Sequence, residues 1–212
     1  HVHGGSGTNL VQVTAGQLRL NADIDGSGVH TAVAVSGPAT WVQFFTGQQL
    51  ASLSIRDHAE VELQQGSGIA LQVNQLQMGG QTHAGTLDIQ DNGLVVRYFG
   101  ASPIGLLEDH IEHARSSNAP AWWTGEGITS GLADLPSDQL VAEEADDYFA
   151  GLGGTFHGAT LGAGDAAVLI ELRQPGQGEA RNAARTGKPA ETIPHRQSGR
   201  STERRPVPSA RA

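Results

Sequence analysis

The sequence contains no cysteine, which excludes disulfides, zinc–thiolate sites and a thiol nucleophile and leaves the compartment undecided. Long apolar runs are also missing: none approaches the roughly 18 residues that a membrane-spanning helix needs, so we expect no membrane span. Aromatic residues make up 5% and charged residues 17% of the chain, and this charged share is below the usual quarter. Because the first residue is His1 rather than methionine, we expect the chain to begin at a cut or processing point.

The few charges are distributed unevenly. Residues 1–173 contain 19 Asp and Glu against 5 Arg, whereas residues 174–212 contain 8 Lys and Arg against 3 Glu. An acidic body disfavours contact with phosphate backbones, and the basic end has no aromatic ring to stack on a base. We therefore expect no nucleic-acid partner. Residues 174–212 also hold too few large apolar residues to offset the entropy of ordering, which predicts a disordered basic tail.

Glycine, in contrast, is abundant at 29 residues, and it supplies the positive φ angles of tight turns. From residue 11 to residue 98 the dominant pattern is period-two alternation in very short pieces. The alternation predicts these inward-pointing pairs: Val11/Val13, Leu18/Leu20, Val33/Val35, Val42/Phe44, Leu53/Ile55, Val61/Leu63, Leu71/Val73, Leu87/Ile89 and Leu94/Val96. They fall into two interleaved series that recur about every 20 residues. One series continues from Leu53 to Leu71 and Leu87, and the other from Val61 to Leu76 and Leu94.

This recurrence predicts parallel β-helix (β-solenoid) coils over residues 1–99. Each coil of such a fold buries its inward residues only when another coil stacks on it. Asp25–Gly28, Gln65–Gly68 and Asp91–Gly93 are turn sequences at the expected places. An antiparallel sandwich also separates short strands by turns, and it remains the alternative.

The pattern changes near residue 100, and residues 100–173 are predicted to form a small α+β cap. Ser102 as N-cap and Pro103 at the first helical position indicate the start of a helix. The apolar face of this helix is predicted to consist of Leu106, Leu107, Ile111 and Ala114. Ala142–Phe149 is predicted to be a second short helix, and Ala166–Leu172 a final strand.

Several segments together resemble a known family. Thr46–Ile55, Gly85–Tyr98, Ala101–Ile104 and Ala121–Gly131, with the last strand at Val168–Leu172, look like a recurring closing segment. That segment is similar to the C-terminal end of large autotransporter-type β-solenoid surface proteins, which are typical of planctomycetes and related environmental bacteria. The resemblance covers about residues 10 to 173, and its motifs are specific only in combination.

The resemblance implies a secreted or surface-attached protein with a structural, adhesive or polysaccharide-associated role. The family has no agreed catalytic residues, so none is carried over to this chain. Many relatives place a calcium-binding dockerin-like repeat after the final strand, whereas Gln174–Glu179 follows here without paired Asp or Asn. This departure puts dockerin-style anchoring in doubt. We expect a monomer in the extracellular space or at the cell surface.

One candidate metal site stands out in the sequence. Asn21, Asp23 and Asp25 match the opening of a calcium loop, in which alternate oxygens and a Gly turn wrap the ion. The closing carboxylate would fall at Ala32, so an Asx-rich turn between strands is the alternative interpretation. Apart from calcium at these residues, no cofactor is expected.

Aromatic residues near the cap form the candidate sugar site. Trp122, Trp123 and Tyr98 are candidates for a platform that stacks on the apolar face of a sugar. The alternative is that these rings close the open end of the solenoid core, where strand edges must be covered. His110 and His113 are three residues apart rather than the four of a zinc-protease helix, and we interpret them as part of a solvated polar helix face.

Three functions follow, in order of preference. The first is a non-catalytic structural or adhesive module, since no nucleophile motif or phosphate loop is present. The second is a carbohydrate-binding module that uses the region of Trp122 and Trp123. The third is the remnant of a polysaccharide-degrading β-helix enzyme whose catalytic coils lie elsewhere.

Overall fold

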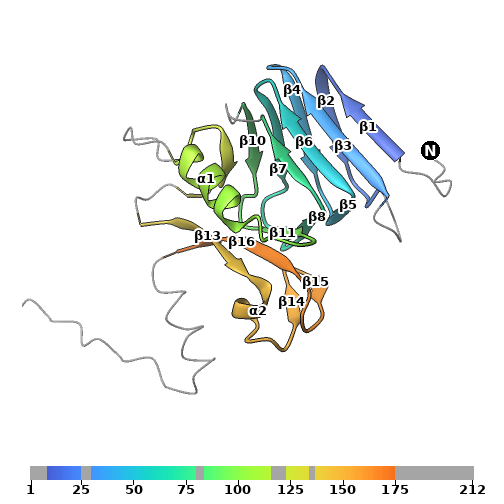
Figure 1. The fold of residues 1–212 in the computed structure, drawn as a ribbon. Coiled ribbons are helices and arrows are strands. Elements are labelled where there is room, and N and C mark those ends of the chain that lie inside the picture. Colours follow the sequence, from blue (N-terminus) through green and yellow to red (C-terminus); the bar gives the residue numbers. More distant parts are fainter. Residues whose placement is uncertain (1–8, 25–29, 80–83, 116–122, 134–136, 175–212) are drawn as a thin grey trace, which may run out of the picture. The chain divides into compact units, whose positions relative to one another are not determined.

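The computed structural model describes residues 9–24, 30–79, 84–115, 123–133 and 137–174. These residues belong to one compact unit of residues 1–178 (Figure 1). The unit is mainly β and forms a β-solenoid of about three turns, as predicted. Coil strands pair in parallel, so the antiparallel-sandwich alternative is wrong. Apart from Gln174, the predicted disordered tail of 174–212 lies outside the described residues.

Each turn of the solenoid contributes strands to three sheets, which we name sheets A, B and C. Sheet A consists, in spatial order, of β1 (Asn9–Val13), β3 (Thr31–Ser36), β6 (Ser52–Arg56) and β9 (Leu76–Met78). Sheet B consists of β2 (Gly16–Leu20), β4 (Thr40–Phe44), β7 (Ala59–Leu63), β10 (Gly85–Asp88) and β12 (Gly127–Thr129). Sheet C consists of β5 (Gln48–Leu50), β8 (Ala70–Val73), β11 (Gly93–Arg97), β16 (Ala167–Arg173) and β13 (Gln139–Glu144).

The predicted inward pairs stack in register and fill the core. In sheet A, for example, Val11 is level with Val33, and Val33 is level with Leu53. The largest fully buried side chains of the coils are Phe44, Leu50, Leu53, Ile55, Leu63, Leu71, Leu87, Ile89 and Leu94. Full burial of each such side chain contributes about 1.5–3 kcal/mol. Stacking of coils is therefore the main source of stability.

The two interleaved series of the sequence analysis are wrong beyond Leu53 and Val61. Leu71 and Leu94 are register partners in sheet C, whereas Leu76 pairs with Leu53 in sheet A. Leu87 pairs with Val61 in sheet B. The error arises because each turn has a third strand, and β5 has only three residues with a glutamine at an inward position.

Buried amide side chains satisfy the backbone at two corners of the coils. Asn92 is fully buried; its Oδ1 accepts from the Ile69 N–H at 3.1 Å, and its Nδ2 donates to the Gln64 carbonyl at 2.9 Å. Gln48 acts similarly two turns earlier. Its Oε1 accepts from the Ile24 N–H at 3.1 Å, and its Nε2 donates to the Ala22 carbonyl at 3.1 Å. Such amides link one coil to the next at corners, where the backbone groups do not pair as they do between strands.

Helix α1 (Ile104–Ala114) packs against β12 and β13 and closes the end of the stack beyond β10 (Figure 1). The helix begins one residue later than predicted, with Pro103 as N-cap, while the Ser102 hydroxyl accepts from the Ile104 N–H at 3.1 Å. Leu107, Ile111 and Ala114 are buried as expected, but Leu106 is exposed. Residues of α1 and β12 belong to the same apolar core as the coils.

The chain then reverses direction on sheet C. β16 pairs antiparallel with β11, and β13 pairs antiparallel with β16. The final strand is thus confirmed at Ala167–Arg173, and the predicted short helix Ala142–Phe149 is confirmed in its second half only. Its first residues extend β13, and only α2 (Ala145–Tyr148) is helical. Pairing with β16 outweighs the helical preference of Ala142, Glu143 and Glu144.

The outward side of sheet C is covered as well. The hairpin of β14 (Gly154–Phe156) and β15 (Ala159–Leu161), together with α2, builds a second apolar cluster on it. Phe156 and Leu161 of the hairpin pack there with Val95 and Leu169 of the sheet. None of the described helices is long and apolar enough to cross a membrane.

Candidate functional site

The three outward surfaces of the coils differ in chemistry. Much of the surface of sheet C is covered by the hairpin and α2, which pack on β11 and β16, although Gln49 of β5 is exposed. On sheet A, the central outward positions carry small side chains, namely Ala32, Ala34, Ser52 and Ser54. On sheet B, the same positions carry a tryptophan, an arginine, glutamines and carboxylates. Sheet B is therefore the surface with the means to recognise a ligand.

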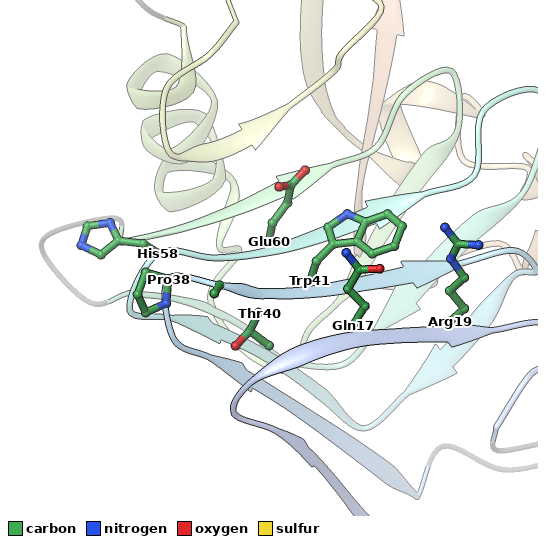
Figure 2. Close-up of a pocket in the computed structure, with 8 residues that line it drawn as sticks. Gln17, Arg19, Pro38, Thr40, Trp41, His58 and Glu60 are labelled. Carbon is green, nitrogen blue, oxygen red and sulfur yellow. The ribbon is translucent and has the colours of Figure 1, made fainter.

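An open groove of about 440 Å³ lies on this surface (Figure 2). We name it the sheet B groove, and its lining includes Gln17, Arg19, Thr40, Trp41, His58 and Glu60. Figure 2 shows the indole of Trp41 between Gln17 and Arg19 on one side and Glu60 on the other. Trp41 is half-buried, so part of its ring remains available to a ligand.

The parallel register arranges the outward side chains in two rows. The first row runs through Gln17, Trp41, Glu60 and Thr86, one from each strand from β2 to β10. The second row runs through Arg19, Gln43, Glu62 and Asp88 on the same strands. Neighbouring members of a row are about 4.8 Å apart along the backbone ladder. The groove is thus built on rigid strands rather than on loops.

The indole of Trp41 is held by its neighbours. The guanidinium carbon of Arg19 lies 5.4 Å from the centre of the ring, a cation–π arrangement. The side-chain amide of Gln43 donates to Glu62 Oε1 at 3.2 Å. Hydrogen bonds from Trp41 and Gln43 partly offset the upward shift of the Glu62 pKa. Trp41 and Glu62 therefore form one connected group.

Three carboxylates of sheet B have raised pKa values. Burial is the main cause of the raised pKa of Glu60, and the charges of Asp88 and Glu62 raise it further. Burial and the charge of Asp88 likewise raise the pKa of Glu62. Burial raises the pKa of Asp88 although its oxygens accept hydrogen bonds from Gln90 and Gly131. These three carboxylates therefore take up protons at a higher pH than isolated, solvated carboxylates do.

One edge of the groove is tied to the cap. The ring Nδ1 of His58 lies in direct contact with Glu126 Oε1. Asp57 and His58 both have positive φ angles, 53° and 63°, in the left-handed region that Asp and His tolerate better than most residues. This turn between β6 and β7 places His58 beside Trp41 and Glu60 in the groove lining.

The predicted calcium site is only partly visible. Asn21 is exposed and Asp23 is half-exposed, while Asp25 lies outside the described residues. Among the described residues, no group of three or more His, Asp or Glu is arranged to hold a metal ion. Calcium at Asn21, Asp23 and Asp25 therefore stays a prediction.

The predicted aromatic platform is distributed differently. Trp123 is only 7% exposed and belongs to the main core, and Tyr98 is half-buried with its hydroxyl donating to Glu144 Oε2 at 2.9 Å. Trp122 lies outside the described residues. A sugar-binding role for these residues stays a prediction. The interpretation of His110 as solvated is wrong, because it lies on the buried face of α1, whereas His113 is exposed as predicted.

Sequence reasoning missed Trp41 and the two rows around it. The signal was present, because Trp41 directly precedes the inward pair Val42/Phe44, as Glu60 precedes Val61. Residues that alternate with inward residues point outward. Aligning the outward residues needed the register of three sheets, which the two-series interpretation did not supply.

Comparisons with known proteins add no relatives to this picture. No protein family matches the sequence, and no similar protein was found among curated proteins or solved structures. The class of the protein therefore rests on the fold itself: a β-solenoid closed at one end by a helix and two antiparallel strands. Because a fold does not determine an activity, function must be argued from the sheet B groove.

Proposed function

We propose that this chain is a non-catalytic β-solenoid module, extracellular or at the cell surface, that binds a polysaccharide in the sheet B groove. The observation that supports this most directly is the position of Trp41. Its partly accessible ring lies among hydrogen-bonding side chains held in register by parallel strands. The proposal combines the adhesive and carbohydrate-binding interpretations of the sequence, and it moves the binding site from Trp122 and Trp123 to Trp41.

The chemistry of the groove suits a sugar. A sugar ring has an apolar face that packs on an indole and a rim of hydroxyls that need hydrogen-bond partners. Around Trp41 the side chains of Gln17 and Glu60 offer amide and carboxylate groups. A shallow site with one aromatic anchor and a few polar groups is typical of ligand recognition. Since the outward rows extend over four strands, they also suit a polymer rather than a single sugar.

The surroundings of the groove support an adhesive role. The closed end and the shared core of coils and cap make a stiff body that can carry a binding face. The resemblance to autotransporter-type surface proteins favours an extracellular or cell-surface setting. Both points support the proposal independently of Trp41.

Binding is tested by calorimetric titration of the full chain with a panel of soluble polysaccharides, in parallel with tryptophan fluorescence. Trp41→Ala removes the aromatic anchor. We expect this variant to lose roughly 2 kcal/mol of binding free energy, as for an interface hot spot, which weakens binding about 30-fold. Phe99→Ala is the matched control, because Phe99 is 96% exposed and does not line the groove. The control is expected to bind as the unaltered chain does.

Two results would contradict the proposal. A flat titration across the whole panel would remove carbohydrate binding altogether. Loss of binding in Trp122→Ala with normal binding in Trp41→Ala would move the site back to the cap.

A second candidate, a polysaccharide-cleaving enzyme, is favoured by one observation. Glu60 lines the groove, and Glu62 points to the same side of β7; both have raised pKa values, and carbohydrate-cleaving enzymes use a pair of carboxyl groups. Release of reducing ends from a bound polysaccharide, lost in Glu60→Gln, would support this candidate over the non-catalytic one. Absence of release from every polysaccharide that binds would remove it.

A further inference from the structure

The outward surface of sheet B, on which the groove lies, has an excess of negative charge. Glu60 and Glu62 are two residues apart on β7 and so point to the same side of the strand. Asp88 is the register partner of Glu62 on β10. Arg19 is the one cation among the described members of the two rows, and its guanidinium lies over Trp41. Three carboxylates therefore face one basic group.

These carboxylates differ in how far the protein satisfies them. Asp88 accepts from the N–H groups of Gln90 and Gly131, both at 2.9 Å, and from the Gln90 amide at 2.7 Å. Glu62 accepts from the Gln43 amide at 3.2 Å. For Glu60, no hydrogen bond is formed within the described part of the chain. Asp88 is thus held by its surroundings, whereas Glu60 is open to an external donor.

The charge is not an isolated feature, because it lies beside the aromatic anchor. Trp41 is the register partner of Glu60, and Gln43 that of Glu62. A ligand that rests on the indole therefore places its rim next to the carboxylates of β7. A positive group on that rim would relieve the mutual repulsion of these carboxylates and form charge-assisted hydrogen bonds.

We propose that the sheet B groove selects a polysaccharide whose sugars carry free amino groups, with an ammonium placed against Glu60 and Glu62 while the ring rests on Trp41. This inference rests on the proposed function, since it names the class of ligand for the same groove. Acidic polysaccharides are disfavoured by the same carboxylates. The wider body repels them too, because residues 1–173 contain 19 Asp and Glu against 5 Arg.

A basic peptide shares the positive charge but fits the groove less well. Its cations sit at the ends of flexible side chains, which lose rotamer entropy when fixed. A sugar ring instead holds its amino group rigidly beside the face that packs on the indole. The observations therefore favour the amino polysaccharide, and the basic peptide becomes an outcome of the test.

The test compares three β-linked oligosaccharides of equal length by calorimetry on the full chain: a glucosamine oligomer, its fully N-acetylated form and a uronic acid oligomer. Titrations are run near pH 6 at low salt, where the amine is protonated and charge effects are least screened. We expect the glucosamine oligomer to bind about tenfold tighter than the acetylated form, as for one charge-assisted hydrogen bond. The uronic acid oligomer is expected to bind weakest.

The variant Glu60→Gln/Glu62→Gln keeps the size of both side chains and removes their charge. We expect it to lose the preference for the glucosamine oligomer over the acetylated form. The matched control is Glu108→Gln/Glu112→Gln, which removes two exposed carboxylates from α1 and does not alter the groove. The control is expected to keep the preference.

Three other outcomes of the titrations would overturn the inference. Equal affinities for the glucosamine and acetylated oligomers would overturn the inference and leave the proposed function standing. Binding of a lysine oligomer as tight as that of the glucosamine oligomer, unaffected by Trp41→Ala, would also overturn it in favour of a basic peptide. Failure of every oligosaccharide to bind would overturn both the inference and the proposed function.

Discussion

Replacing Gly127 with alanine should undock the cap from the coils. Gly127 is the first residue of β12, has a φ of +123° and lies against the backbone of α1. A Cβ atom at this position would be 2.1 Å from the His110 carbonyl oxygen and 3.3 Å from the Ala114 Cβ. The obstacle is helix backbone rather than a flexible side-chain end, so it cannot simply rotate away.

Two costs add to give the expected size of the effect. A side chain held at this φ costs about 1–3 kcal/mol. Moving the strand or the helix to relieve the overlap costs a further 1–3 kcal/mol or so, as for other overpacked sites. We therefore expect Gly127→Ala to lower the free energy of unfolding by roughly 2–6 kcal/mol, measured by urea unfolding followed by circular dichroism.

Gly105→Ala is the matched control. Gly105 lies on α1, and a Cβ atom there would meet nothing within 4 Å. Because alanine suits a helix better than glycine, the control should be unchanged or more stable by up to about 1 kcal/mol. If Gly127→Ala unfolded at the same urea concentration as the control, the close approach of β12 to α1 would be refuted.

Three further predictions concern the corner, the cap and the acidic surface. Asn92→Ala leaves the Ile69 N–H without its partner, while the Gln64 carbonyl still accepts from the Ser67 hydroxyl, and it should cost about 1–3 kcal/mol; an unchanged thermal melt would contradict the role of this corner. Deletion of residues 100–173 exposes the edges of β10 and β11 and should give aggregated β protein, whereas recovery of a soluble monomer by gel filtration would argue against capping. The raised pKa values of Glu60, Glu62 and Asp88 mean that the folded chain takes up protons at a higher pH than the unfolded chain. Their contribution to stability should therefore increase as the pH falls from 7 toward 4.5. The urea midpoint of Glu62→Gln should depend less steeply on pH than that of the unaltered chain, and equal slopes for the two proteins would refute this.

The inward pairs of the coils were predictable because burial imposes a strict alternation on each strand. Val33/Val35 and Val61/Leu63 are buried as their pattern predicts. The number of sheets was not predictable in the same way. At β5 the inward position of Gln48 is polar, since it serves a corner rather than the apolar core, and the alternation is lost there.

The cap was predictable only in part. The start of α1 followed from local chemistry, because a serine before a proline marks a helix N-terminus. The strands β12 and β13 have no such local signal: β12 begins with Gly127, and β13 ends in two glutamates. Both are strands because existing sheet edges pair with them, and such pairing is a property of the fold rather than of the segment.

The candidate site, like the cap, was predictable from the sequence only in part. That Trp41 and Glu60 point outward follows from the alternation around them, but their side-by-side placement depends on the register between β4 and β7. A shift of one residue would move every outward side chain of β7 to the inside. Sequence reasoning therefore favoured Trp122 and Trp123, because the proximity of two adjacent residues can be inferred without knowing the register between strands.

The reversal of the chain on sheet C acts as a terminator. Parallel coils propagate because the edge of each coil is a template for another strand of the same direction, and a solenoid with such an edge has no intrinsic length. β16 pairs with the edge of β11 in the opposite direction, and β13 adds a second antiparallel strand beyond β16. A coil arriving at this end, from another molecule or from the same chain, meets a strand of the wrong polarity on one of its three sheets. Growth of the solenoid at this end is therefore stopped by geometry rather than by solubility.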